Sequence, residues 1–374
     1  MSLRRNGRLA VLNVLLSITE TSGAYYQHCL GVADRREITI CTYFKSNIRV
    51  PDGIRLFQGD DTLLGFFRAL RAVLRADEYD IVHAHSPHVG LLFVLLDLLL
   101  LGRFARISVY NVQNSYQNYK LRNKLLMLPV FAYFRRVVCC SQACYESFPR
   151  IYRWLGGDRL RVVANGLDIG RADRILAQNP RNVHDDIFRV VSVGRLIDIK
   201  NPHAILRAFA QSDDGTGRLA YIGEGHLLES LRTAAGTLGV AGRAEFTGLI
   251  PRDQVFQRLS NADLVISASR GEGLPVAVIE AMACRCPVIL SDIEPHREIA
   301  EGASFIPLIA PDDVAGLARA IERFRQMPAA ERAAIGERCR QLVEQRYSLE
   351  AMHKGYEAVY AQVFERPQSG EAAA

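Results

Sequence analysis

The stretch DLVISASRGEGLPVAVIE, residues 263–280, decides the fold of this chain. It opens with an apolar run, residues 264–269, and such a run bounded by turn signals predicts a buried parallel strand. Pro275 suits the first turn of a following helix. Two carboxylates therefore flank a strand-to-helix transition, with Glu272 in the loop and Glu280 two turns into the helix.

The spacing within this stretch suits a sugar nucleotide. From Leu274 to Glu280 is roughly 9 Å along a helix, comparable to the distance from a sugar ring, across a diphosphate, to a ribose. The helix N-terminus between the two carboxylates offers free N–H groups and a positive dipole end to an anion. Two glutamates at this spacing also occur commonly as an ordinary surface residue and an ordinary helix residue. Further motifs are therefore needed to support a binding site.

A second strand and loop lie about seventy residues upstream, in FRVVSVGRLIDIKN, residues 188–201. The pattern predicts a strand over 190–193 and a turn at Gly194, followed by Arg195 and Lys200. A guanidinium fork and an ammonium at the carboxyl end of a strand are what a diphosphate needs. The alternative is an ordinary pair of solvated basic residues.

A third loop follows the strand in LAYIGEGH, residues 219–226. The segment Gly223-Glu224-Gly225 lacks two side chains, which lets backbone approach a ligand closely. Alone this Gly-x-Gly is a weak signal, but it is one of three strand-to-helix loops in the same half of the chain.

At these residues the sequence resembles the retaining glycosyltransferases of family 4, which have the GT-B fold. The resemblance covers nearly the whole chain, is highly specific over residues 188–300 and is looser in the first half. The matching motifs are NGLD (165–168), VGRL…KN (193–201), IGEG (222–225), FTGLIPRDQV (246–255), EGLPVAVIEAMACRCPVI (272–289) and YSLEAMHKGYEAVY (347–360).

The resemblance implies an α/β protein with two Rossmann-like parallel-sheet domains facing across a cleft. Residues 1–178 would form an acceptor-binding domain, residues 187–346 a nucleotide-sugar-binding domain, and residues 347–366 a C-terminal helix that crosses back to the first domain. Composition agrees, because 374 residues exceed what one core usually sustains. Polar residues 177–186 are interpreted as the linker, and residues 367–374 as a frayed tail.

Alternating strands and helices predict parallel sheets in both halves. In the first half the predicted strands are 9–16, 37–42, 81–84, 107–112 and 137–140, and helices are expected to begin near 312, 331 and 348 in the second. The apolar run 89–101 contains Asp97 and is too short to span a bilayer, so a buried helix is expected.

The rest of the composition indicates a cytosolic protein. The apolar stretch 9–18 lacks the small-residue cleavage site of a signal peptide and is interpreted as the first strand. Eight cysteines without a C-x-x-C pair predict reduced structural thiols rather than a disulfide framework or a zinc site.

The resemblance also implies roles in donor binding. Glu272 would bind sugar hydroxyls and Glu280 the ribose hydroxyls, while Arg195 and Lys200 would neutralise the charge that grows on the departing diphosphate. No metal and no cofactor are expected beyond the nucleoside diphosphate sugar. The other donor contacts expected are Gly23, Gly194, Gly223, Glu224, Leu249, Gly273, Leu274 and Pro275.

The acceptor side is expected in the first half of the chain. In DIVHAHS, residues 80–86, strand alternation puts His83 and His85 on one face; we expect His85 to contact the acceptor and His83 to be buried. Where many relatives carry a histidine near the reacting carbon, this chain has Gln113 and Asn114, whose amides orient groups but do not titrate. Same-face attack, with the diphosphate accepting the proton and Gln113 beside the reaction, is the mechanism that the resemblance implies.

Charge is unevenly distributed along the chain. Residues 1–180 contain 24 Lys and Arg against 14 Asp and Glu, whereas the remainder contains 22 against 26. No acidic residue lies between Asp97 and Glu146, a span rich in leucine and phenylalanine. Such a stretch is typical of a face that docks on an anionic membrane to meet a carbohydrate or lipid-linked acceptor, or of a helix whose basic side is merely solvated. The basic residues of the span are Arg103, Arg106, Lys120, Arg122, Lys124, Arg135 and Arg136.

Three classes of function remain open. The first is a glycosyltransferase acting on a polysaccharide or glycolipid acceptor at the cytoplasmic membrane face. The second is a nucleotide-sugar epimerase or phosphorylase of the same architecture, and the third is a non-catalytic sugar-nucleotide binder. A dehydrogenase is disfavoured because no G-x-G-x-x-G follows the first strand of either half, and nucleic acid is disfavoured because the basic excess is modest and no recognition motif is present.

Overall fold

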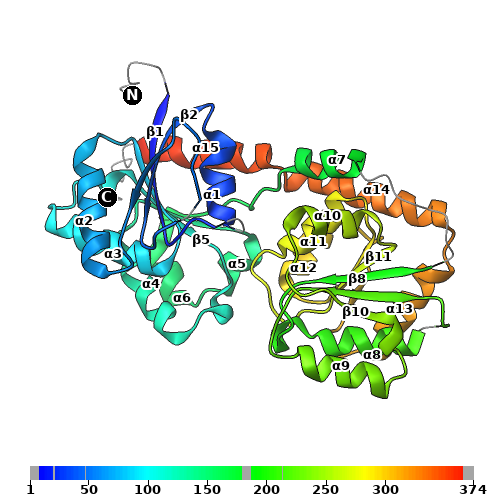
Figure 1. Cartoon of the computed structure of the whole chain (residues 1–374). Coiled ribbons are helices and arrows are strands. Elements are labelled where there is room, and N and C mark those ends of the chain that lie inside the picture. Colours follow the sequence, from blue (N-terminus) through cyan, green and yellow to red (C-terminus); the bar gives the residue numbers. More distant parts are fainter. Residues whose placement is uncertain (1–7, 20–21, 47, 179–186, 213, 365–374) are drawn as a thin grey trace, which may run out of the picture. The chain divides into compact units, whose positions relative to one another are not determined.

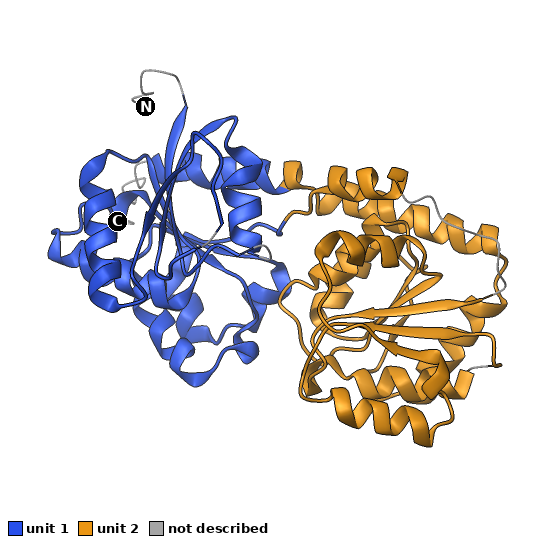
Figure 2. Ribbon diagram, in the orientation of Figure 1, with its two compact units in different colours: residues 1–165, 352–374 blue, residues 166–351 orange. Residues whose placement is uncertain are grey.

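The computed structural model describes residues 8–19, 22–46, 48–178, 187–212 and 214–364. It divides the chain into two compact units, coloured separately in Figure 2: unit 1 is residues 1–165 with 352–374, and unit 2 is residues 166–351. The predicted tail 367–374 and most of the predicted linker, residues 179–186, lie outside the described residues.

The described part of unit 1 contains a seven-stranded parallel sheet in the order β3-β2-β1-β4-β5-β6-β7 (Figure 1). The strands are β1 (Leu9–Leu15), β2 (Arg36–Thr42), β3 (Arg55–Gln58), β4 (Ile81–Ala84), β5 (Ser108–Val112), β6 (Arg136–Cys139) and β7 (Leu160–Val162). The helices are α1 (Gly23–His28), α2 (Leu63–Ala76), α3 (Pro87–Leu99), α4 (Leu121–Tyr133), α5 (Gln142–Ser147), α6 (Arg150–Gly156) and most of α15 (Leu349–Phe364).

The described part of unit 2 contains a six-stranded parallel sheet in the order β10-β9-β8-β11-β12-β13. The strands are β8 (Arg189–Val193), β9 (Arg218–Ile222), β10 (Ala244–Phe246), β11 (Leu264–Ser267), β12 (Val288–Ser291) and β13 (Leu308–Ile309). The helices are α7 (Ile169–Gln178), α8 (Pro202–Ser212), α9 (Leu228–Thr237), α10 (Arg252–Ser260), α11 (Val276–Ala283), α12 (Glu294–Ala300), α13 (Val314–Gln326) and α14 (Ala329–Arg346).

Local sequence explains why these segments adopt these conformations. The central strand β1, LAVLNVL, is buried at nearly every residue, as expected for a parallel strand that is covered on both faces. Thr62 caps the N-terminus of helix α2, because its side chain accepts a hydrogen bond from the Gly65 amide. The helix buries Phe66, Leu70 and Val73 on one stripe. The predicted fold class, two Rossmann-like parallel sheets, is confirmed.

The boundary between the units differs from the predicted one. It falls between Asn165 and Gly166, inside the NGLD motif, rather than in the linker after residue 178. Helix α7 belongs to unit 2 because it packs against α10 and α11 there. Its Arg171 donates to Asp253 at 2.7 Å, and its Asp173 accepts from Arg340 at 2.8 Å.

The C-terminal helix changes unit along its length. The predicted helix 347–366 is observed as α15, and its residues from Met352 onward belong to unit 1. There the Tyr360 hydroxyl lies 2.9 Å from His83 Nδ1, and His353 Nε2 donates to the Gln27 carbonyl at 2.8 Å. These contacts attach α15 to β4 and α1 of unit 1.

The apolar run 89–101 forms most of α3, but the expectation of a buried helix holds for one side only. Val89 and Phe93 are buried, and the Asp97 carboxylate accepts from the Phe104 amide at 3.0 Å and from the Tyr133 hydroxyl at 2.8 Å. Leu99 and Leu101, in contrast, are exposed. The sheet needs only one apolar stripe from this helix, and the second stripe faces outward.

Candidate functional site

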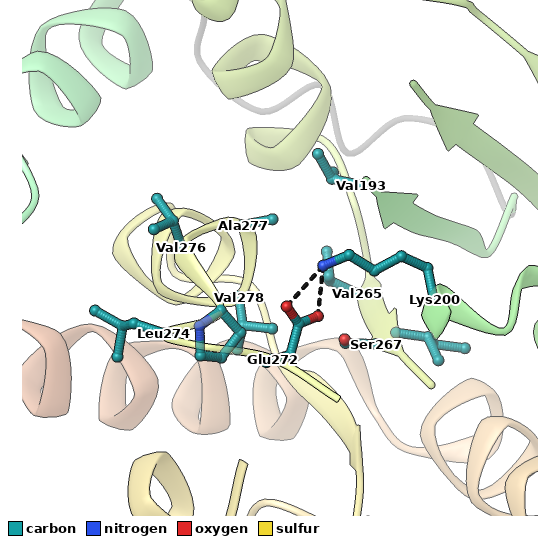
Figure 3. Close-up of a pocket in the computed structure, with 11 residues that line it drawn as sticks. Val193, Lys200, Val265, Ser267, Glu272, Leu274, Val276, Ala277 and Val278 are labelled. Atoms are coloured by element: carbon teal, nitrogen blue, oxygen red, sulfur yellow. Dashed lines mark hydrogen bonds and ion pairs between the residues drawn. The ribbon is translucent and has the colours of Figure 1, made fainter. Parts of the chain in front are cut away.

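A cavity of about 220 Å³ in unit 2 lies at the carboxyl ends of β8 and β11 and beside the first turn of α11 (Figure 3). Parallel sheets bind ligands at this edge, and a helix N-terminus there favours an anion. Of the predicted donor-binding residues, Lys200, Glu272, Leu274 and Pro275 line this cavity together.

The two charged residues of the cavity face each other. Lys200 Nζ lies 2.5 Å from Glu272 Oε1 and 2.7 Å from Oε2, as the dashed lines in Figure 3 show. The Ser269 hydroxyl donates to the same Oε1 at 2.6 Å. The buried Glu272 carboxylate is thus held by a cation and a hydroxyl, which fixes its direction at the cavity wall.

Glu280 lies on α11, the helix that follows the Glu272 loop, and is paired with a different cation. The Arg252 guanidinium, at the start of α10, donates to Glu280 Oε1. Burial raises the pKa of Glu280 above its ordinary value, and the attraction of Arg252 acts in the opposite direction. The two carboxylates of the EGLPVAVIE segment are therefore each paired with a basic residue from a different element.

The predicted glycines of the site bring two loops into contact. Gly194 and Gly223 have φ values of +151° and +140°, which other residues rarely adopt. A Cβ on Gly223 would lie 2.2 Å from the Gly194 carbonyl oxygen. Gly223 is thus required by the packing of the loops after β8 and β9, whereas Gly194 is favoured by its positive φ.

The remaining predicted donor residues lie around this centre. Arg195 and Gly194 line a small hollow with Lys200, and Arg195 is exposed. Glu224 Oε1 is 3.5 Å from the Leu249 amide, and the Leu249 side chain is exposed. Gly273 is buried in the loop between Glu272 and α11.

The predicted acceptor residues are found in unit 1, at the carboxyl end of its sheet. His83 and His85 lie on one face, as predicted, with ring centroids 4.0 Å apart. His85 is buried, and its Nε2 lies 3.0 Å from Asn13 Oδ1. His28 of α1 joins them, with its ring centroid 4.7 Å from that of His85. Burial lowers the pKa of all three histidines, so they are neutral at physiological pH.

Gln113, Asn114 and Gly23 are also in unit 1. Gln113 Oε1 accepts from Asn165 Nδ2 at 2.9 Å, while its buried Nε2 has no partner among the described residues. Asn114 is exposed and follows it directly. Gly23 begins α1, and a Cβ there would meet nothing closer than Gln27 Oε1 at 3.8 Å. Its predicted contact with the donor diphosphate stays a prediction.

Three residues of these sites carry no assigned role in the sequence prediction. Arg252 lies inside the motif FTGLIPRDQV, and Ser269 ends the apolar run before Glu272, so each stands in a segment that the prediction singled out. His28 has no such signal, because it reaches His83 and His85 only through the fold. In the part of the chain that the structure describes, no three His, Cys, Asp or Glu side chains are grouped as metal ligands.

Comparisons with known proteins identify the family of the chain. Residues 32–171 match the family model described as Glycosyltransferase Family 4, and residues 174–342 match the model described as Glycosyl transferases group 1. The sequence is 28% identical over 300 residues to EpsD of Bacillus subtilis (strain 168), a protein named as a glycosyltransferase; the match covers 76% of this chain and 77% of EpsD.

A second relative and a solved structure extend the likeness. WcaL of Escherichia coli (strain K12), named for glycosyl transfer in colanic acid biosynthesis, is 26% identical over 205 residues, or 53% of this chain and 50% of WcaL. The crystal structure of Anabaena HepE in complex with UDP and glucose matches with a TM-score of 0.74 over 95% of this chain and 100% of HepE, at 19% identity. That identity is low, so this match speaks for the fold alone.

Proposed function

Because the chain belongs to the family 4 glycosyltransferases and has the GT-B fold, we propose that it transfers a sugar from a nucleoside diphosphate sugar to an acceptor hydroxyl with retention at the anomeric carbon. The acceptor in this proposal is a lipid-linked or growing polysaccharide or glycolipid, met at the cytoplasmic face of the membrane. Relatives named for polysaccharide biosynthesis, such as WcaL, support that class of acceptor.

One observation carries the proposal: a cation, a carboxylate and a helix N-terminus line a single cavity in unit 2. In the proposed complex the diphosphate lies at the start of α11, within reach of Lys200 and Arg195. Glu272 accepts hydrogen bonds from sugar hydroxyls, and Glu280 binds the ribose hydroxyls. HepE, which has the same fold and was solved with UDP and glucose, supports a donor of this chemical class.

The proposed chemistry depends on charge rather than on a covalent intermediate. In this proposal negative charge grows on the departing diphosphate, and Arg195, Lys200 and the α11 amides stabilise it. Each such donor is worth about 3–4 kcal/mol in a transition state. We propose that these groups act without a metal ion and without a further cofactor.

The acceptor would approach from unit 1. The unpartnered Nε2 of Gln113 is a hydrogen-bond donor that can orient an attacking hydroxyl. Neutral His85 and exposed Asn114 are the other proposed acceptor contacts. In the proposed same-face attack the departing diphosphate accepts the hydroxyl proton, so no titrating base is required.

The first experiment is a thermal-shift screen with UDP-, GDP- and ADP-sugars. A donor that binds the native state raises the melting temperature by mass action. The donor found in this way is then incubated with acceptor lipids, and the anomeric configuration of the product is determined by NMR. Release of a free or epimerised sugar without an acceptor would favour the epimerase or phosphorylase class, and binding without turnover would favour a non-catalytic binder.

Two variants test the positive wall of the cavity. Arg195→Ala should abolish transfer at an unchanged melting temperature, because the exposed Arg195 side chain makes no hydrogen bond or ion pair to a described residue. Lys200→Ala should abolish transfer and also lower the melting temperature, because the buried Glu272 carboxylate loses the cation that pairs with it. Wild-type turnover in either variant would remove the proposed phosphate contacts.

A further inference from the structure

Two helices of unit 1, α4 and α6, expose large apolar side chains to solvent. The exposed fractions are 72% for Leu121, 58% for Leu125, 54% for Ile151 and 76% for Trp154. Single exposed leucines are common on protein surfaces, whereas a group of large apolar residues that includes tryptophan marks an interaction surface. We call these four residues, with the basic residues described below, the α4–α6 patch.

The two helices pack directly against each other. Helices α4 and α6 pack against each other and lie side by side in Figure 1. The Tyr152 hydroxyl of α6 donates to the Lys124 carbonyl of α4 at 2.7 Å, and the Lys124 ammonium lies 4.4 Å from the centre of the Tyr116 ring. The Tyr152 hydrogen bond thus ties α6 to α4, while the four large apolar side chains of the two helices remain exposed.

Basic residues are interleaved with the apolar ones on both helices. In the sequence, Lys120 and Arg122 are the neighbours of Leu121, Arg150 precedes Ile151, and Arg153 precedes Trp154. None of these four basic side chains forms an ion pair with a residue that the structure describes. Their charge is thus available to an outside partner.

The structure also shows that the basic residues of the span 98–145 do not form the single face that was predicted. Arg136 is not on a surface: it is buried in unit 1, and its guanidinium donates to the Gln362 carbonyl at 3.1 Å. The span is divided among the end of α3, helix α4 and strand β6, so it is not one face. Helix α6, which the prediction did not include, supplies the rest of the patch.

We propose that the α4–α6 patch docks this protein on the surface of an anionic lipid bilayer. Apolar side chains that enter the acyl boundary, together with lysine and arginine at the level of the headgroups, are the chemistry of interfacial membrane binding. Tryptophan is favoured at this depth because its ring is apolar and its N–H is polar. No helix among the described residues is long and apolar enough to cross a bilayer.

The position of the patch suits a lipid-linked acceptor. Eight residues, 113–120, separate the end of β5 from the start of α4, and they include Gln113 and Asn114. The patch therefore begins at the carboxyl edge of the sheet, the edge at which such folds bind ligands. This part of the inference rests on the proposed function, whereas bilayer binding itself needs neither donor nor acceptor.

A single residue gives the experiment a direct signal. Trp154 is the only tryptophan of the chain, so intrinsic tryptophan fluorescence reports on the patch and on nothing else. The full-length protein is mixed with vesicles of phosphatidylcholine alone, or of phosphatidylcholine with phosphatidylglycerol, and co-sedimentation is measured in the same samples. We expect co-sedimentation and a blue shift of the emission with the anionic vesicles, both weakened by added salt.

Variants separate the electrostatic contribution to vesicle binding from the apolar one. Each of Lys120→Gln, Arg122→Gln, Arg150→Gln and Arg153→Gln should weaken binding to anionic vesicles about fivefold. The double variant Leu121→Ser with Leu125→Ser should weaken it about tenfold per leucine that inserts fully. The matched control is Leu99→Ser with Leu101→Ser, because these exposed leucines lie near the opposite, amino-terminal edge of the same sheet; it should bind like the wild type.

Each outcome decides the inference. Absence of co-sedimentation with anionic vesicles would overturn it, as would equal binding to both kinds of vesicle. Binding without a shift of the Trp154 emission, or loss of binding in the control variant, would assign the contact to another surface and equally overturn it. Donor binding in the thermal-shift screen is independent of these results, so failure of the patch and failure of the proposed function are distinguishable.

Discussion

Arg252→Ala tests how much the ion pair with Arg252 stabilises the buried Glu280 carboxylate. Breaking a fully buried ion pair by removing one partner costs about 3–5 kcal/mol, because an uncompensated charge remains. The Glu280 side chain is 10% exposed, but that of Arg252 is 27% exposed, so solvent already weakens the pair. We therefore expect the variant to lose about 2 kcal/mol at neutral pH, or about 6 °C in melting temperature for a unit of this size.

The loss should depend on pH in a defined direction. Burial raises the folded-state pKa of Glu280, so its contribution to stability is fully present below the unfolded pKa of 4.5 and is lost as pH rises through the folded pKa. Without Arg252 the folded pKa rises further. The difference between variant and wild type should thus be close to zero below pH 4.5 and reach its full size above the folded pKa of the variant.

The same helix provides a matched control. Arg258 of α10 also binds a glutamate, Glu245, but the two side chains are 45% and 52% exposed. Exposed pairs contribute about 0–1 kcal/mol, so Arg258→Ala should change stability little. Urea unfolding of both variants at several pH values measures the comparison. Equal destabilisation by the two substitutions, or a loss in Arg252→Ala that does not vary with pH, would refute the reasoning.

Two further predictions concern the loops and the histidines. Gly223→Ala should lower the free energy of unfolding in urea by about 3 kcal/mol, because its Cβ would lie 2.2 Å from the Gly194 carbonyl oxygen at a positive φ. Gly236→Ala in α9 should raise it by about 1 kcal/mol, because its Cβ would meet nothing within 4 Å. Similar effects of the two substitutions would contradict the packing argument. Burial lowers the pKa of His85 to about 3, so its contribution to stability is present above its ordinary pKa of 6.5 and is lost as pH falls toward 3. In His85→Gln the slope of unfolding free energy against pH should fall by about 1.4 kcal/mol per unit over that range, and an unchanged slope would count against the buried neutral form.

Local pattern predicts much of this molecule. Strand β4 is found at the predicted residues 81–84, and β1 and β5 differ from the predictions by one residue at one end. These strands are continuous apolar runs with turn signals on both sides, and burial on both faces leaves little freedom for another conformation.

Elements with weak patterns escaped the prediction. Strand β3, Arg55–Gln58, pairs with β2 only, at the edge of its sheet, and its end residues are exposed. Strand β13 has two residues. Such strands are defined by the neighbour that they pair with, so their own residues carry too little signal.

The contacts of the candidate site are also predicted from sequence only where a motif carries them. The sequence prediction grouped Lys200 with Glu272 through known motifs, and the structure pairs their side chains at 2.5 Å. The Arg252–Glu280 pair joins residues of two helices, α10 and α11, and the contact of His28 with His85 joins residues 57 positions apart in the chain. Only tertiary packing brings these residues together, and no spacing in the sequence predicts these contacts.

The eight buried cysteines have a practical consequence. All eight cysteines are buried, none forms a disulfide with a described residue, and burial raises the pKa of those at positions 29, 41, 284 and 339. Maleimide dyes attack accessible thiolates, so the native protein should react with them slowly. One cysteine engineered on an outer helix face would then be the preferred labelling position, and spectroscopic probes can be attached there while every native cysteine is retained.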